Sequence, residues 1–197
     1  YFGYGTPIGS HFAPHNPYYV DLVDVYPYDP EAARALLAEA GLPDGFRATL
    51  ALPPTAYARR SGEIIQAQLA RIGVAVELLP MEWAQWLEQV FSGFDYDMTI
   101  VAHTEPLDIG IYARGDAYYF GYQNPTFEAL IERLNETVVP EGRAALYGAA
   151  QMLLAVDQAA IFLFQLPKLG VHAAGLSGLW ANSPIQANDV TRVRWDP

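Results

Sequence analysis

Apolar and polar positions along this chain follow two spacings, one typical of strands and one typical of amphipathic helices. Short apolar runs at 46–52, 74–79 and 96–102 predict three strands. Between these runs, apolar residues recur three and four positions apart, as they do on one face of a helix. Strand, helix, strand, helix, strand at these spacings predicts an α/β fold in two or three layers, with parallel strands joined by helical crossovers.

The two ends of the chain differ from this pattern. Residues 1–28 are rich in Gly, Pro, Tyr and His without a helical or strand period, so an extended loop is predicted there. Residues 176–197 also lack a clear period. The sequence therefore divides into this loop, an α/β lobe over 29–175 and a tail over 176–197. Within the lobe, the pattern predicts helices at 30–40, 57–71, 82–91, 127–134 and 142–156, and two further strands at 160–165 and 168–171.

The first helix has both of its ends encoded in the sequence. Asp29 can accept a hydrogen bond from the free N–H groups of the first turn, and Pro30 stands at N1, where a missing N–H costs nothing. Glu31 adds negative charge at the positive end of the helix dipole. Gly41 can adopt the left-handed conformation that ends a helix. The apolar residues of this helix form one stripe: Ala32, Ala33, Leu36, Leu37 and Ala40.

Residues 28–41 read Tyr-Asp-Pro-Glu-Ala-Ala-Arg-Ala-Leu-Leu-Ala-Glu-Ala-Gly. This sequence resembles a signature of the family 5 extracellular solute-binding proteins. The Gly- and Pro-rich loop before it and the helix and strand over 61–76 are similar to that family as well. Further segments that resemble the family follow in its order at 82–83, 94–98, 122–125 and 143–151. These matches run in order over essentially the whole chain, and this order carries the resemblance.

The resemblance implies a lobe of the type II periplasmic-binding-protein kind, with a central, mostly parallel sheet and flanking helices. Proteins of this family are substrate-binding components of ABC importers for peptide, nickel or opine-type solutes. They are longer and have two lobes, and the matching segments lie in their C-terminal part. We therefore expect a C-terminal lobe that forms half of a ligand cleft, with a missing N-terminal lobe and a membrane permease as partners.

The same resemblance implies a periplasmic location, with the missing signal peptide explained by where this fragment begins. It also implies that the tail over 176–197 returns to the missing N-terminal lobe. We therefore expect the tail to have few contacts within this lobe.

Composition narrows the choice of partners. The 197 residues carry a formal net charge of −11, which argues against nucleic acid and against an anionic membrane surface. Cysteine is absent, so there is no disulfide, thiolate metal site or cysteine nucleophile. No apolar stretch is long enough to span a bilayer, and no cofactor is indicated.

The candidate binding residues follow the third predicted strand. Ligands of α/β sheets lie outside the carboxyl ends of the strands, and this position holds His103, Glu105, Asp108 and Tyr112. The resemblance implies an acidic residue in this loop that pairs with an amino group or another cation of the ligand, and Glu105 and Asp108 match it. Two carboxylates near one cleft favour a peptide or another amino-bearing or cationic solute.

Aromatic residues and one arginine complete the predicted ligand site. Trp83 begins a helix just after a strand end, and Tyr119 follows the acidic loop; such rings stack on peptides, sugars or cations. Arg59 lies in the first turn of a helix and can clamp a ligand carboxylate. With the second lobe absent, we expect exposed rings and self-association of the fragment through them. The rings expected to be exposed are Tyr18, Tyr19, Trp83 and Tyr119.

Other interpretations of the acidic loop stay open. His103, Glu105 and Asp108 have side chains that suit Zn or Ni. A hydrolase with an acidic dyad would use Glu105 and Asp108, although these two are close in sequence for groups that flank a sugar. A free-standing protein-interaction domain is a third alternative. No catalytic residue is assigned, because none of the serines stands in the Gly-x-Ser-x-Gly setting of a nucleophile elbow.

Overall fold

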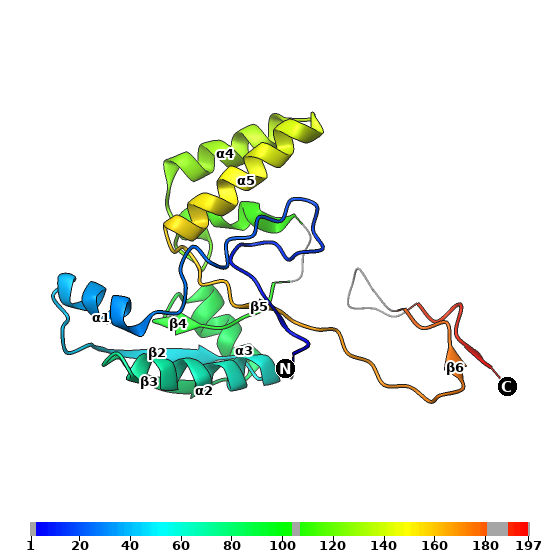
Figure 1. Ribbon diagram of the computed structural model, residues 1–197, viewed down its shortest axis with the longest axis horizontal. Coiled ribbons are helices and arrows are strands. Elements are labelled where there is room, and N and C mark those ends of the chain that lie inside the picture. The colour runs from blue at the N-terminus through cyan, green and yellow to red at the C-terminus, as the bar shows by residue number, and fades with distance from the viewer. Residues whose placement is uncertain (1–2, 104–106, 181–188, 197) are drawn as a thin grey trace.

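The structure is a computed structural model, and it describes residues 3–103, 107–180 and 189–196. The chain forms a sheet unit and a helical unit, and the N-terminal loop runs between them (Figure 1). The last part of the chain leaves both units as an arm (Figure 1). No helix of the described ranges combines the length and the hydropathy that a bilayer crossing needs.

The sheet unit is built on three parallel strands in the order β3–β2–β4. Strand β2 (Arg47–Leu52) pairs with β3 (Ala75–Pro80) along the full length of both. Strand β4 (Met98–Thr99) pairs with β2 at two residues. The predicted parallel sheet is therefore confirmed, although its third strand is much shorter than the expected 96–102.

Helix α2 (Ala56–Ala70) connects β2 to β3 and packs on the sheet (Figure 1). The helix approaches closely at Gly62, where an added Cβ would lie 2.8 Å from Cδ1 of Leu52. The side chain of Gln66 donates a hydrogen bond from Nε2 to the carbonyl oxygen of Val76 at 2.7 Å. The buried side chains of this layer come from the strands and the helix, which explains the apolar runs in the sequence. They are Leu50, Leu52, Ala58, Val74 and Val76.

Helix α1 (Pro30–Glu39) begins where the sequence predicts. Oδ1 of Asp29 accepts hydrogen bonds from two backbone N–H groups of the first turn, at 3.0 and 2.9 Å. Gly41 follows the helix with a φ of +80°. No residue of α1 is buried, and Leu36 keeps 64% of its surface exposed. The apolar stripe of this helix is thus largely open to solvent.

The crossover from β3 to β4 is a helix whose geometry changes midway. Helix α3 (Trp83–Trp86) continues directly into a π-helical segment, η1 (Leu87–Ser92), so the predicted helix is confirmed with a wider second half. The buried Trp86 donates a hydrogen bond from Nε1 to Oγ1 of Thr99 at 2.9 Å. Thr99 donates in turn to the carbonyl oxygen of Ala51, also at 2.9 Å. These two bonds attach the end of β4 to both the helix and β2.

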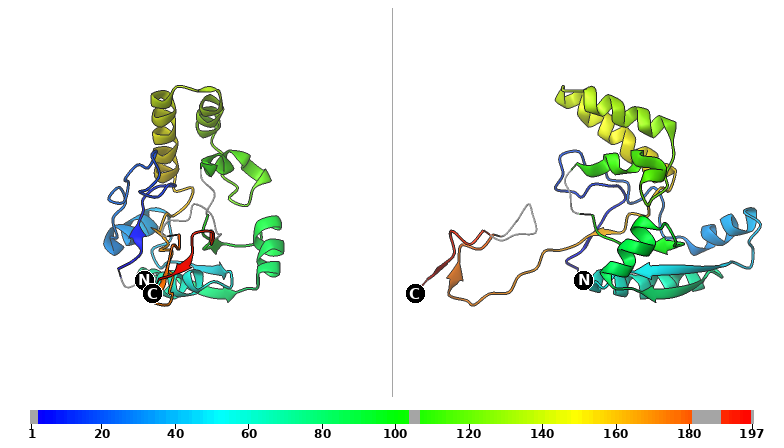
Figure 2. Two further views of the ribbon diagram at one scale, coloured as in Figure 1. Left: turned by 90° about the vertical axis from the view of Figure 1, so that its right-hand side faces the viewer. Right: turned by 180° about the vertical axis from the view of Figure 1, so that it is seen from behind.

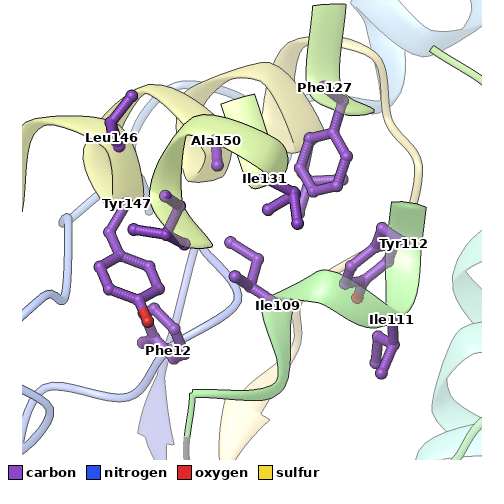
Figure 3. Close-up of a cluster of buried hydrophobic side chains, with 11 residues drawn as sticks. Phe12, Ile109, Ile111, Tyr112, Phe127, Ile131, Leu146, Tyr147 and Ala150 are labelled. Atoms are coloured by element: carbon purple, nitrogen blue, oxygen red, sulfur yellow. The ribbon is translucent and has the colours of Figure 1, made fainter. Parts of the chain in front are cut away.

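The helical unit has a core of its own. Helices α4 (Pro125–Glu136) and α5 (Pro140–Val156) form where the sequence predicts helices, and they pack side by side. A 3₁₀-helical segment, η2 (Asp108–Ala117), packs against α4 and kinks at Gly115; the sequence did not predict it. Figure 3 shows Ile109 of η2 and Ile131 of α4 pointing toward one another. The buried residues of this core are Phe12, Ile109, Ile111, Tyr112, Phe127, Ile131, Leu134, Leu146, Tyr147, Ala150 and Leu154.

Long-range contacts order the N-terminal loop. Strand β1 (Thr6–Pro7) pairs in antiparallel fashion with β5 (Phe164–Gln165). Ser10 is fully buried and donates a hydrogen bond to a carbonyl oxygen of the same loop at 2.6 Å. The buried Gln151 of α5 donates from Nε2 to the carbonyl oxygen of Tyr18 at 2.7 Å. A segment without a periodic pattern is therefore fixed by residues far away in the sequence.

After β5 the chain leaves both units as an arm (Figure 2). The strand predicted at 168–171 does not form there, and that prediction is wrong. Val171 is fully exposed, because this short apolar run meets no sheet on which to pack. Strands β6 (Leu176–Ser177) and β7 (Arg194–Trp195) pair with each other in antiparallel fashion near the end of the arm.

Candidate functional site

The carboxyl ends of the three parallel strands lie at one edge of the sheet, which we call the carboxyl edge. There β2 leads into α2, β3 leads into α3, and β4 leads into the segment before η2. Arg59, Trp83 and His103 each belong to one of these three segments. Because loops meet at this edge in α/β proteins, it is the place where a ligand is expected.

Asp108 is the first residue of η2, and a histidine from the N-terminal loop holds it. Nε2 of His11 lies 2.7 Å from Oδ1 of Asp108, and the two side chains are only 5% and 13% exposed. An ionised carboxylate only accepts hydrogen bonds, so the imidazole N–H donates. The sequence analysis did not single out His11, because no local pattern marks a residue whose partner lies 97 positions away.

The turn before Asp108 has an unusual backbone. Leu107 adopts the left-handed conformation, with a φ of 60°. For a residue other than glycine this costs about 1 kcal/mol. Such a conformation persists where the surrounding structure holds it in place. The contact between His11 and Asp108 follows directly after this turn, so it helps to hold the turn at Leu107 in place.

His103 joins the same group from the segment after β4. Its Nε2 lies 2.9 Å from the hydroxyl of Tyr119, and its Nδ1 lies 3.7 Å from Oδ2 of Asp108. This Oδ2 is buried and has no hydrogen-bond partner among the described residues. We call the four residues His11, Asp108, His103 and Tyr119 the His–Asp cluster. The cluster connects the N-terminal loop and η2 with the segment that leaves β4.

Tyr112 and Tyr119 are both packed residues, each 4% exposed. Tyr112 stacks on Phe120 with ring centroids 4.6 Å apart, and Tyr119 meets Trp86 edge-on at 5.7 Å. Burial raises the pKa of both hydroxyl groups; the charge of Asp108 adds to this at Tyr112, and neighbouring tyrosines add to it at Tyr119. Both side chains are therefore neutral at physiological pH.

The expectation of four exposed rings is wrong for three of them. Tyr119 is buried, and Tyr18 and Tyr19 are partly buried. The ring of Tyr18 stacks on Tyr147 of α5 at 4.3 Å, because the N-terminal loop is attached to that helix. Trp83 is the member of this set that is exposed, at 42% of its surface. Self-association of the fragment stays a prediction.

Of the remaining candidate residues, Trp83 and Arg59 lie among the described residues and Glu105 does not. Trp83 begins α3, and its ring contacts Trp86 at 5.6 Å. Arg59 lies in the first turn of α2 and is exposed to solvent. Glu105 lies outside the described residues, and with it the second carboxylate of the predicted pair. The described structure thus brings Asp108 and His103 together, with Trp83 and Arg59 on neighbouring segments of the same edge.

The described ranges contain no group of His, Cys, Asp and Glu side chains arranged to hold a metal ion. His11 and His103 approach different oxygens of the Asp108 carboxylate, and Asp108 Oδ1 is already engaged by His11 at 2.7 Å. The Zn or Ni alternative therefore gains no support from the described residues.

A hollow of about 590 Å³ lies near the start of β4, at what we call the amino edge. Tyr119 is the one predicted site residue in its wall. Oδ2 of Asp97 accepts hydrogen bonds from the backbone N–H and the hydroxyl of Thr49 at 2.7 and 2.8 Å, and Asp116 accepts one from Gln123. Both carboxylates are exposed. The lining residues are Phe94, Tyr96, Asp97, Asp116, Tyr118, Tyr119, Phe120 and Gly121.

Known sequences similar to this chain are solute-binding proteins. A family model described as bacterial extracellular solute-binding proteins, family 5 Middle, matches residues 1–112. Heme-binding protein A of Haemophilus influenzae is 32% identical over 170 residues, which are 78% of this chain and 30% of that protein. The chain therefore spans less than a third of the length of this relative.

Solved structures of periplasmic binding proteins have the same fold. The binding protein DppA from Helicobacter pylori, in complex with the peptide STSA, matches with a TM-score of 0.73 and 25% identity over 83% of this chain and 34% of that chain. A dipeptide-binding protein from a Pseudoalteromonas species, in complex with Met-Leu, matches with a TM-score of 0.80 and 21% identity over 100% of this chain and 41% of that chain. The second likeness shows the fold alone. The expected fold class, a lobe of the type II periplasmic-binding-protein kind, is confirmed.

Proposed function

The chain belongs to the bacterial extracellular solute-binding proteins of family 5, and from this premise we propose that it forms one lobe of a periplasmic receptor that delivers a solute to an ABC importer. The observation that carries the proposal is the His–Asp cluster. Its largely buried, hydrogen-bonded carboxylate, beside His103 of the segment that follows β4, supports a ligand site at the edge where α/β proteins bind ligands.

In this proposal the chain supplies half of a ligand cleft. Relatives in the comparisons are much longer, so the other half would come from a part of the receptor outside these residues. Closure of the two halves about a hinge would bury the solute. The arm supports this arrangement, because it extends from both units and carries Trp180 and Trp195 at 43% and 67% exposure (Figure 2). The arm would pack on the second lobe.

We propose an amino-bearing or cationic solute, with peptides as the leading class. Asp108 contributes a negative charge in a partly dry setting, where charges act more strongly than in water. Glu105 would add a second carboxylate from the same loop. Trp83 offers an exposed ring for stacking or a cation–π contact, and Arg59 offers a guanidinium for a carboxylate of the solute.

The proposal includes no catalytic step. Relatives reported above carry the names of binding proteins. The carboxylate of Asp108 is engaged by His11, whereas the acidic dyad of a glycosidase places two carboxyl groups on either side of a bond to be cleaved. A hydrolase would convert the same solutes into products, which gives this alternative its own measurable outcome.

Calorimetric titration of the complete receptor that carries this chain tests the proposal. The probes are dialanine, its N-acetylated form, putrescine, a neutral sugar and a dicarboxylate. We expect dialanine or putrescine to bind, and N-acetylation to weaken dialanine binding by about tenfold or more, as for the loss of one charge-assisted hydrogen bond. The 197-residue chain alone should bind the same probes at about millimolar strength or weaker.

Variants show whether the carboxyl edge carries this binding. Glu105→Gln and Asp108→Asn should each weaken binding of the amino-bearing probe, whereas Asp97→Asn at the amino edge should leave it unchanged. Unchanged affinity in both carboxyl-edge variants, or preference for the dicarboxylate, would contradict the proposed site. Release of free alanine during the titration would favour the hydrolase.

A further inference from the structure

The backbone on both sides of His11 is held in place by packing. Gly9 lies so close to Leu22, further along the same loop, that a Cβ on Gly9 would come within 2.1 Å of the Leu22 carbonyl carbon. Ser10 is fully buried and hydrogen-bonded. Phe12, on the other side, is 5% exposed and belongs to the core of the helical unit. The position of the His11 side chain is thus determined by its neighbours as well as by its polar partner.

The imidazole ring of His11 lies among aromatic side chains. Phe12, Tyr112 and Phe162 surround it edge-on, with ring centroids 4.9, 5.4 and 6.3 Å away. These walls keep water away, and a hydrogen bond between polar groups is stronger in such surroundings than in solvent. The ring is therefore held so that its Nε2 meets the carboxylate of Asp108.

The titratable groups around this pair come from different elements. Asp108 and Tyr112 belong to η2, His103 follows β4, and Tyr119 follows η2. The two tyrosines are neutral, because burial raises the pKa of each. His103 stands 3.7 Å from Oδ2 of Asp108, while His11 stands 2.7 Å from Oδ1. Among the described residues, His11 is therefore the closest donor to this carboxylate.

We infer that His11 is a positioning residue for the solute site and acts through Asp108. By donating to Oδ1, it holds the first residue of η2 in place and, with it, the left-handed turn at Leu107. The inference rests on the proposed function, because Asp108 is the carboxylate that this function assigns to the solute. The N-terminal loop thus helps to position the solute site and does not serve only to connect other segments of the chain.

A matched pair of substitutions separates the effect of the His11 hydrogen bond from the effect of its ring packing. His11→Phe keeps the aromatic packing and removes the donor, whereas His11→Gln removes the ring and keeps an amide N–H that can reach Asp108. Each variant is prepared in the complete receptor. Calorimetric titration with dialanine and with its N-acetylated form is run well below the melting temperature of each variant, so that only folded protein is measured.

The expected result is a loss of dialanine affinity of about tenfold or more in His11→Phe, with most of it restored in His11→Gln. In an Asp108→Asn background, His11→Gln should cause no further change. Equal affinity in parent and His11→Phe, or an equal loss in both variants, would overturn the inference while the proposed function stands. Failure of the parent to bind any probe would instead remove the proposed function.

An NMR measurement tests the inference even if His11→Phe does not fold. A slowly exchanging imidazole N–H resonance of His11 should appear in the parent, shift strongly in Asp108→Asn, and respond to dialanine. An imidazole N–H that exchanges freely with water, or one that does not respond to bound dialanine, would overturn the inference.

Discussion

The two edges of the parallel sheet use polar side chains in opposite ways. At the carboxyl edge, the largely buried carboxylate of Asp108 is hydrogen-bonded to His11, 97 positions away in the sequence, and His103 stands 3.7 Å from its other oxygen. At the amino edge, the exposed Asp97 accepts hydrogen bonds from Thr49 of β2, and the exposed Asp116 at the end of η2 accepts one from Gln123, seven residues further on. An exposed carboxylate has water as an alternative partner, and a buried one does not. The carboxyl edge should therefore respond much more strongly to substitution.

The largest effect is expected from the indole that supports the carboxyl edge. Trp86→Ala would remove a buried ring that packs on Tyr119 and donates to Thr99, and should lower the free energy of unfolding by about 3–5 kcal/mol. Trp83→Ala, three residues away and 42% exposed, is the control and should cost less than about 1 kcal/mol. Urea denaturation of both variants measures the difference. Similar losses in the two would contradict the packing described for α3.

The next effect compares one carboxylate from each edge. Asp108→Ala should lower the free energy of unfolding by about 2–3 kcal/mol, because it leaves the buried donor of His11 without its partner. Asp116→Ala at the amino edge should cost less than about 0.5 kcal/mol. Chemical denaturation at neutral pH measures both. An Asp116 variant as unstable as the Asp108 variant would show that burial does not distinguish the edges.

Alkaline pH gives a third way to test the carboxyl edge. Burial raises the pKa of Tyr112, so the unfolded chain releases this proton more readily than the folded one. The contribution of the neutral Tyr112 hydroxyl to the free energy of unfolding is complete below the ordinary tyrosine pKa of about 10. Above that pH it falls, by up to about 1.4 kcal/mol for each pH unit. Tyr112→Phe should therefore flatten the decline in unfolding free energy between about pH 10 and pH 11. An unchanged slope would contradict the burial of this hydroxyl.

The smallest effect belongs to the amino edge at acid pH. Hydrogen bonds from Thr49 lower the pKa of the Asp97 carboxyl in the folded protein. The ionised carboxylate therefore stabilises the fold above the ordinary aspartate pKa, and this stabilisation is lost as the pH falls through the pKa of the folded state. Asp97→Asn should thus be slightly less stable than the parent at neutral pH, and the two should converge on acidification. Thermal melts across this pH range measure the convergence. A gap that widens toward acid would show the opposite sign of shift.

The sheet unit shows what the sequence predicts well. Strands β2 and β3 and helix α2 begin and end within two residues of their predicted bounds, because their apolar residues face a core formed by neighbouring elements. Strand β4 is shorter than predicted, because only two of its residues pair with β2. Segment η2 was missed, because glycines interrupt its apolar pattern at Gly110 and Gly115.

The candidate site was predicted only in part. The sequence pointed to the acidic loop because this loop follows a strand, and the structure brings His103 and Asp108 within 3.7 Å of each other. His11 was missed, because its role depends on how the N-terminal loop folds back, which no short pattern describes. The exposure of Tyr119 was misjudged for a similar reason: Trp86 and Phe91, from the helical segments after β3, contact its ring. Contacts between distant segments account for each of these differences.

The most direct test of the central claim is a backbone amide NMR titration of the 197-residue chain with dialanine. The claim is that solute meets this lobe at the carboxyl edge. The account predicts saturable shifts at about millimolar dialanine in Ala102, His103 and Gly110, with the amino-edge residues Phe94 and Gly121 unchanged. Shifts confined to the amino-edge hollow would contradict it, and so would equal shifts with N-acetylated dialanine.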